Sequence, residues 1–253
     1  MFTYAQSHSV VTLTLDREAS RNRVDMRSAQ LLRDFRDRIG DDEDIRAVII
    51  TGSGRDVFCT GMDTAEAATY DDKRLYTKTI GVADTVASIA CPVIAAINGK
   101  TSGLGLELAL ACDLRLCSQS ALLGMPQINQ REIPWDGGTQ RLTRLVGKAK
   151  ALEMILLGEE VDAGEAYRIG LVHKVFPPDK LMEAARKMAG KIVRQSPLSL
   201  AYAKEAIHKG MDMTLAQGLR LEADLYFLLH TTQDRAEGIG AFREKRRPEF
   251  KGT

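Results

Sequence analysis

The sequence predicts an α/β fold with a parallel sheet, followed by a largely helical C-terminal region. Two observations lead to this prediction: short apolar strands alternate with amphipathic helices in the first part of the chain, and helical patterns dominate after Pro177-Pro178. Parallel strands need a crossover of a dozen or more residues, which a helix normally supplies. We therefore divide the chain into a core, residues 1–195, and a helical region, residues 196–253.

The first strand, helix and strand lie between residues 10 and 50. Residues 10–15 alternate apolar side chains with threonine, as a half-buried strand does. Apolar residues then recur at helical spacing over 31–39, and Gly40 follows them. Residues 47–50 form a short apolar run typical of a buried strand. This order indicates a βαβ unit.

Residues 92–113 repeat the pattern and contain an unusual carboxylate. An apolar strand, 93–97, leads into a turn with Gly99, Gly103 and Gly105, and an apolar helix carries Glu107. An ionised group is costly to bury unless it is paired or hydrogen-bonded. Glu107 is therefore either a satisfied structural residue or a group kept for chemistry. Another strand is predicted over 114–117.

The remaining chain is predicted to be mostly helical. A loop bracketed by Pro126 and Pro134 ends at Gly137-Gly138, and a helix follows it. The residues 162–165 have capping-box spacing, so a helix should start there and end near Gly170. Later helices are predicted over about 179–195, 197–209 and 214–230. The last is apolar around more than one face, which suggests self-association, or else deep burial within one chain.

Composition excludes several classes of protein. The 253 residues are 44% hydrophobic and 27% charged, with a formal net charge of +1, so no electrostatic feature predicts nucleic-acid binding. The four cysteines lack C-x-x-C spacing and the histidines are scattered, so we expect reduced core thiols and no metal site. No leader-like N-terminus and no apolar run of about 20 residues is found, which predicts a cytoplasmic protein.

Three stretches carry residues suited to catalysis: 57–63, 102–107 and 125–142. Backbone amides of glycine turns at helix N-termini point outward unpaired, and two such amides converging on one oxygen form an oxyanion hole. Each stretch alone also has a structural explanation, because the glycines permit positive φ and Asp63 and Asp136 are suitable helix caps. A dinucleotide fingerprint is not completed, since Leu108 stands where its third glycine belongs.

Together these motifs resemble the crotonase family of acyl-coenzyme A enzymes, also called the enoyl-CoA hydratase/isomerase family. The likeness spans nearly the whole chain. The matching segments are Leu15-Asp16-Arg17 with Arg21-Asn22, Phe58-Cys59-Thr60-Gly61-Met62-Asp63, Ala96-Ile97-Asn98-Gly99 with Gly103-Leu104-Gly105-Leu106-Glu107-Leu108-Ala109 and Cys112-Asp113, Ile133-Pro134 with Gly137-Gly138-Thr139-Gln140-Arg141-Leu142, and residues 242–250.

The resemblance implies a crotonase-like spiral of ββα repeats with an α-helical C-terminal trimerisation region. It implies a homo-oligomer, either a trimer or a dimer of trimers, and an acyl-CoA thioester as substrate. It implies no separate cofactor, because coenzyme A is part of the substrate. The family holds the thioester oxygen with two backbone amides, which match Met62 and Leu104. Further substrate contacts are expected from these residues: Arg21, Arg23, Gly61, Asp63, Gly103, Trp135 and Lys245.

The acid–base pair departs from the family pattern. In hydratases of this family two glutamates flank the water that adds across the double bond. Glu107 matches the first, but Gln127, which follows Pro126, stands at the second position. An amide neither accepts nor supplies a proton at neutral pH. Three partners for Glu107 therefore remain: Gln127, which would orient a water molecule, Asp136, or a water molecule alone.

Asp136 offers a different chemistry. Some family members that shift double bonds, or hydrolyse or dehalogenate acyl-CoAs, use an aspartate near this part of the loop. Trp135-Asp136 replaces the small residues that hydratases usually have here. Trp135 would then line a flat acyl pocket, although a tryptophan packed over the loop explains it equally well.

Three functions follow from these observations. The first is reversible hydration of an enoyl-CoA, cyclic ones included, with an oxyanion hole and Glu107. The second is an isomerase or hydrolase in which Asp136 partners Glu107. The third, from another class, is a catalytically impaired acyl-CoA-binding or scaffold protein. Retention of Glu107 and both glycine turns favours an enzyme.

Overall fold

Two sheets form the framework of the protein, which is described here from a computed structural model covering residues 1–253 apart from the side chain of Lys73. The larger sheet has the order β1 (Phe2–Ser7), β2 (Val10–Leu15), β3 (Ala47–Gly52), β5 (Val93–Ile97), β7 (Leu114–Ser118) and β10 (Lys174–Phe176). The smaller sheet has the order β4 (Val57–Cys59), β6 (Lys100–Ser102), β8 (Leu122–Gly124) and β9 (Glu160–Asp162).

The chain winds through both sheets as a spiral. In three successive turns the first strand joins the large sheet and the second joins the small one: β3 with β4, β5 with β6, and β7 with β8. Within the large sheet β2, β3, β5, β7 and β10 pair in parallel, and only β1 pairs antiparallel to β2. The predicted ββα spiral and the βαβ unit at its start are confirmed.

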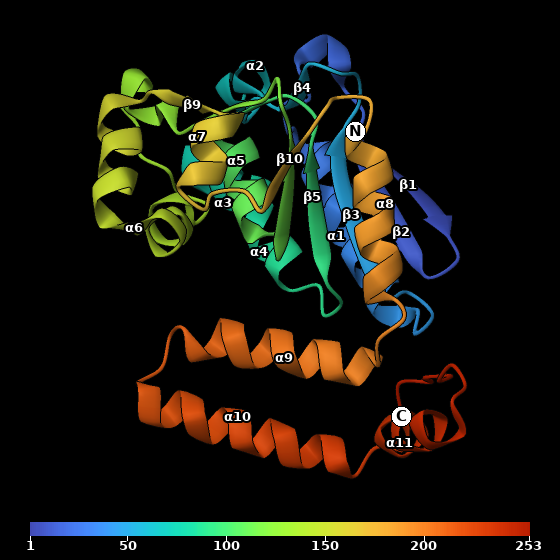
Figure 1. Ribbon diagram of the computed structural model, residues 1–253. Coiled ribbons are helices and arrows are strands. Elements are labelled where there is room, and N and C mark those ends of the chain that lie inside the picture. The colour runs from blue at the N-terminus through green and yellow to red at the C-terminus, as the bar shows by residue number, and fades with distance from the viewer.

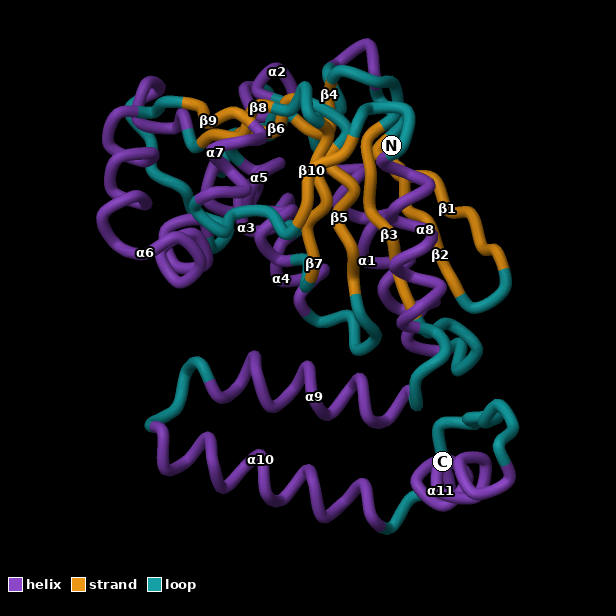
Figure 2. The backbone as a smooth tube through the Cα atoms, in the orientation of Figure 1, coloured by secondary structure: helices purple, strands orange, loops and turns teal.

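Helices fill the turns of the spiral and cover the large sheet (Figure 1; Figure 2). The helices are α1 (Met26–Asp41), α2 (Thr64–Ala68), α3 (Lys73–Ile80), α4 (Ala83–Ala87), α5 (Leu104–Ala111), α6 (Gly138–Leu157), α7 (Ala163–Arg168), α8 (Leu181–Ile192), α9 (Pro197–Gly210), α10 (Leu215–His230) and α11 (Gln233–Glu244). Two 3-10 helices are η1 (Glu18–Ser20) and η2 (Pro126–Gln130). The predicted helices are all present, with ends shifted by a few residues.

The core lies on both faces of the large sheet. On one face α8 packs Leu181, Ala185 and Ala189 against Ile49 and Ile94 of the central strands. On the other face lies the larger cluster, into which α5 is inserted with every one of its residues buried. This burial explains why α5 is apolar all round.

Several caps lie where the sequence places them, with one difference. The side chains of Asp63, Asp162 and Ser196 accept bonds from backbone N–H groups in the first turns of α2, α7 and α9. The full capping box at Asp162 is wrong, because Glu165 turns to Arg168, with an Nε–Oε2 distance of 2.6 Å, instead of reaching back to the cap. Strand β1 was missed, since most of its side chains are exposed and show no clear alternation.

The C-terminal helices lie apart from the spiral (Figure 1). α9 and α10 pack against each other, and Lys204 of α9 ties them to the core through Asp113 Oδ2 at 2.8 Å and the carbonyl oxygens of Ile89 and Cys91. α8 ends at Ile192 and α9 begins at Pro197, so the boundary between residues 195 and 196 falls in the link between them. The division of the chain into a core and a helical region for oligomerisation stays a prediction.

Two expectations from composition bear on the described residues. All four cysteines are free; Cys59, Cys112 and Cys117 are buried, and Cys91 is half-buried. Burial raises the pKa of Cys59 to about 12, so this thiol is kept protonated. Among the described residues, none of the helices has the length and apolar character that crossing a membrane requires.

Candidate active site

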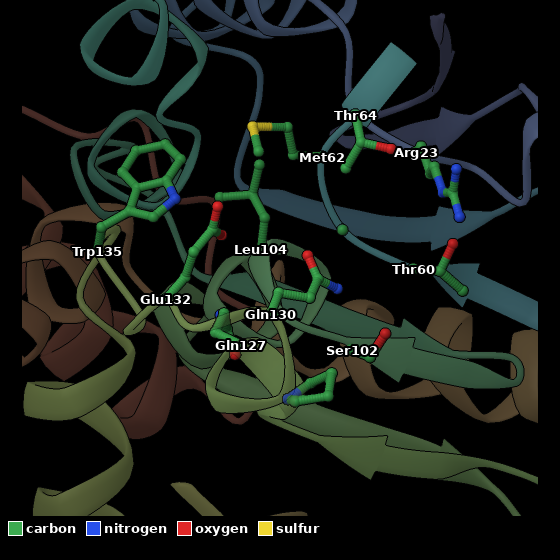
Figure 3. Close-up of a pocket in the computed structure, with 13 residues that line it drawn as sticks. Arg23, Thr60, Met62, Thr64, Ser102, Leu104, Gln127, Gln130, Glu132 and Trp135 are labelled. Atoms are coloured by element: carbon green, nitrogen blue, oxygen red, sulfur yellow. The ribbon is translucent and has the colours of Figure 1, made fainter. Parts of the chain in front are cut away.

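A pocket opens where the loop after β4, the N-terminus of α5 and the 3-10 helix η2 meet (Figure 3). These three segments, together with Arg23 from the loop before α1, supply its wall. The residues that line it are Arg23, Thr60, Gly61, Met62, Thr64, Ser102, Gly103, Leu104, Pro126, Gln127, Gln130, Glu132 and Trp135. Both predicted oxyanion residues are among them.

The backbone amides of Met62 and Leu104 lie at neighbouring points of this wall. Leu104 is the first residue of α5, so its N–H has no acceptor within the helix. Gly61 packs beside it: a Cβ at Gly61 would lie 3.9 Å from Leu104 N. Val24 is hydrogen-bonded to the residues on either side of Met62: its N–H donates to Gly61 O, and its carbonyl accepts from Asp63 N. Neither of these two bonds uses the N–H of Met62. The two amides are thus suited to bind one oxygen atom.

Arg17 holds the loop that carries Met62. Its Nη2 lies 3.0 Å from Asp63 Oδ2 and 3.2 Å from Asp25 Oδ2, and its Nη1 donates to Arg23 O. The carboxylate of Asp63, a predicted substrate contact, is therefore engaged in an ion pair and in the cap of α2. Asp63 therefore helps to fix the loop that carries Met62.

Glu107 is buried just outside the set of lining residues. Its Oε1 accepts from Asp136 N at 2.8 Å and from Gly138 N at 2.9 Å. Its Oε2 is buried and has no hydrogen-bond partner among the described residues. Burial raises the pKa of Glu107 to about 7, against the opposing effect of the two N–H donors. A carboxyl group tuned to this range can both take and give a proton near neutral pH.

Gln127 lines the pocket at the start of η2. Its side chain is buried, Nε2 lies 3.9 Å from Met125 Sδ, and Oε1 finds no partner in the described part of the chain. Gln127 and Glu107 therefore each keep one buried oxygen acceptor free. A water molecule has two O–H donors, so a pair of such acceptors can orient it.

Asp136 directs its carboxylate to a different place. Oδ2 accepts from Val82 N at 2.8 Å and Ala83 N at 2.7 Å, at the start of α4. Burial raises the pKa of this carboxyl group as well. Asp136 contributes to the Glu107 site through its backbone N–H, whereas its side chain is a cap for another helix.

The other predicted site residues divide into two groups. Arg23 and Trp135 line the pocket, and so do the two glycines Gly61 and Gly103. Arg21 lies outside the lining, with a left-handed backbone and a carbonyl that accepts from Thr60. Lys245 caps α11 in the C-terminal region, and in this chain it is not brought to the pocket.

Sequence reasoning missed six lining residues. They are Thr60, Thr64, Ser102, Pro126, Gln130 and Glu132. Four of them flank residues that the motifs identified, so proximity in sequence was a usable signal. Gln130 and Glu132 had a weaker signal, namely their position in the loop bracketed by Pro126 and Pro134.

The pocket brings the backbone amides of Met62 and Leu104 together and lies next to the buried carboxyl group of Glu107, an arrangement suited to an enzyme that acts on an acyl carbonyl. The chain belongs to the enoyl-CoA hydratase/isomerase family, because the model of the family described as "Enoyl-CoA hydratase/isomerase" matches residues 5–253. Its substrate is therefore an acyl-CoA thioester.

Known proteins agree with this assignment. The chain is 42% identical to a protein of Bacillus subtilis (strain 168) named for the enoyl-CoA hydratase/isomerase family, over 100% of this chain and 98% of that one. It is 40% identical to the 2,3-dehydroadipyl-CoA hydratase of Escherichia coli (strain K12), over 98% and 97%. The crystal structure of an enoyl-CoA hydratase from Bacillus anthracis is similar with a TM-score of 0.97 and 38% identity, covering 100% of this chain and 99% of that one.

These relatives decide between the three functions. Hydration of an enoyl-CoA, the reaction of a hydro-lyase, is supported by their names, and neither the isomerase or hydrolase alternative nor the scaffold alternative is favoured. The Asp136 carboxylate accepts from Val82 N and Ala83 N at the start of α4, and Asp136 is not among the residues that line the pocket.

Proposed function

We propose that this protein hydrates a 2-enoyl-CoA with Glu107 as its one acid–base group and Gln127 as the residue that orients the water. The proposal rests on the different surroundings of the two carboxylate oxygens of Glu107. Two backbone N–H groups fix Oε1, whereas Oε2 is buried and has no hydrogen-bond partner among the described residues. A carboxylate held in this way has a defined direction and one oxygen left for a substrate or a water.

The addition of water needs only Glu107, the water molecule and the two backbone amides. Glu107 Oε2 takes a proton from the water, whose oxygen forms a bond to Cβ of the enoyl group. The electrons of the double bond move onto the thioester oxygen, where the amides of Met62 and Leu104 stabilise the charge. Glu107 then gives the proton to Cα, and the carbonyl re-forms.

Gln127 supports the water, and its role can be tested. Its Oε1 would accept one O–H of the water, leaving the other for Glu107, so no second carboxylate is needed. Purified protein mixed with crotonyl-CoA should remove the conjugated enoyl absorbance. Gln127→Ala should lower kcat by about tenfold to a hundredfold, since it loses orientation and not the base. A kcat unchanged in Gln127→Ala would remove Gln127 from the mechanism.

We also propose that the protein is a homo-oligomer, a trimer or a dimer of trimers. The support is the exposed apolar surface of the C-terminal helices: Leu215 is 80% exposed, Phe227 67% and Phe242 85%. Monomeric proteins rarely leave so many large apolar side chains in water. Light scattering after gel filtration should give three or six chains, and Phe227→Glu should lower that number. A monomeric state of the unmodified protein would contradict the proposal.

A cytoplasmic location stays a prediction.

A further inference from the structure

Glu132 places a carboxylate at one end of the pocket. It lines the pocket and is exposed to solvent, and Figure 3 shows its side chain directed toward Trp135 and Leu104. No step of the hydration described above uses it. A group bound beside this carboxylate meets its negative charge.

The backbone around Glu132 is fixed. Its N–H donates to Gln127 O at 3.0 Å, and Arg131, in the left-handed conformation with φ 62°, donates its N–H to Ile128 O at 3.0 Å. These bonds close the end of η2 and tie residue 132 to the segment that carries Gln127. The position of the carboxylate is therefore linked to the catalytic segment.

The pocket has two ends, and Glu132 lies at the acyl end. Arg23 and Thr60 lie on one side of Leu104 and Met62, and Trp135 and Glu132 lie on the other (Figure 3). The proton-transferring group belongs to the second side, because Glu107 is bound by the backbone of residues 136 and 138, next to Trp135. If the thioester oxygen lies at the two amides, the acyl group extends toward Trp135.

The charges at the two ends differ. Among the described residues that line the pocket, Arg23 is the one cation, and it lies at the end away from Glu132. Within the same part of the chain no ion pair involves Glu132. The acyl end is thus negative, and a like charge placed there is disfavoured.

We propose that Glu132 makes this enzyme select acyl groups with an uncharged distal end, preferably one with a hydrogen-bond donor, over acyl groups that end in a carboxylate. The inference rests on the proposed function for the direction in which the substrate lies. One relative is named for dehydroadipyl-CoA, a thioester that keeps a free carboxylate, and the proposal predicts that this chain disfavours such a substrate. Overall identity would have suggested the same substrate; the pocket indicates a different one.

Binding of two saturated thioesters of one size tests the selection without turnover. Adipoyl-CoA ends in a carboxylate, and the corresponding terminal amide ends in a neutral donor. Calorimetry should show that the unmodified protein binds the amide more tightly by on the order of tenfold, a ratio that falls as salt is added. Glu132→Gln should bring the ratio close to one. Glu183→Gln, a matched change at an exposed site on α8, should leave it unchanged.

Turnover gives the second measurement. Glu132→Gln should raise the ratio of kcat/KM for dehydroadipyl-CoA to kcat/KM for crotonyl-CoA by on the order of tenfold. Equal affinities in the unmodified protein, or a ratio that Glu132→Gln does not change, would overturn the proposal. A hundredfold loss on crotonyl-CoA in Glu132→Gln would also overturn it and make Glu132 catalytic. Absence of hydration with the binding preference intact would refute only the proposed function.

Discussion

The start of α5 and the loop before α6 each bury one carboxylate, and the two carboxylates differ in the backbone segments that they bind. Glu107 and Asp136 both accept two backbone N–H groups, and burial raises the pKa of both. Glu107 keeps Oε2 buried without a partner in the described chain, beside a pocket with two outward amides. Asp136 caps α4. The partners of a carboxylate, more than its burial, separate a chemical role from a structural one.

The largest effect that tests this difference is on turnover. Glu107→Gln keeps an acceptor for Asp136 N and Gly138 N but removes the proton-carrying group, so kcat should fall by about a thousandfold or more. The decrease in enoyl absorbance measures it. At pH 5, where Glu107 is protonated, the melting temperature should stay close to that of the unmodified protein, which distinguishes lost chemistry from lost fold. A variant that retains a tenth of the activity would show that the two carboxylates are not divided in this way.

The second effect is on stability and depends on pH. The pKa of Glu107 is raised from 4.5 to about 7 by burial, so between these values the native protein binds more protons than the unfolded chain. The free energy of unfolding therefore falls as pH rises through this window. The loss approaches about 3 kcal/mol by pH 8, in comparison with Glu107→Gln, which has no such group.

Urea unfolding of both proteins at about pH 5, 6, 7 and 8 measures this loss. Asp136 also has a raised pKa and contributes in the same direction in both proteins, so the difference between them reports Glu107 together with its interaction with Asp136. A difference between the two proteins that stays constant with pH would mean that Glu107 titrates as an exposed carboxylate does.

Much of the fold could be predicted from the sequence, because its signals are local. The alternation in β2, the apolar runs of β3 and β5, and the caps at Asp63 and Ser196 all follow from neighbouring residues. The short edge strand β1 escaped, since it buries little beyond Phe2. Pairing in two sheets is a long-range property, and the resemblance to a family supplied it.

The site was predictable to the extent that motifs fix backbone geometry. Met62 and Leu104 follow glycines that set the turns, and Glu107 is one helical turn beyond. The direction of the Asp136 side chain could not be predicted, because it depends on α4, whose first residues lie more than fifty positions earlier. Glu132 carried no motif, and its place in the pocket follows from how η2 ends.

The smallest of these effects concerns Asp136 and tests whether its carboxylate has a structural role alone. Asp136→Ala leaves Val82 N and Ala83 N without their acceptor, which should lower the free energy of unfolding by about 2 kcal/mol. Asp136→Asn keeps one acceptor oxygen and should cost about half as much. Urea denaturation measures both values. Because the N–H of residue 136 still holds Glu107, Asp136→Asn should keep kcat within about tenfold of the unmodified protein. A loss in Asp136→Asn as large as that in Glu107→Gln would make the Asp136 carboxylate a participant in the reaction and restore the mechanism in which the two act as a pair.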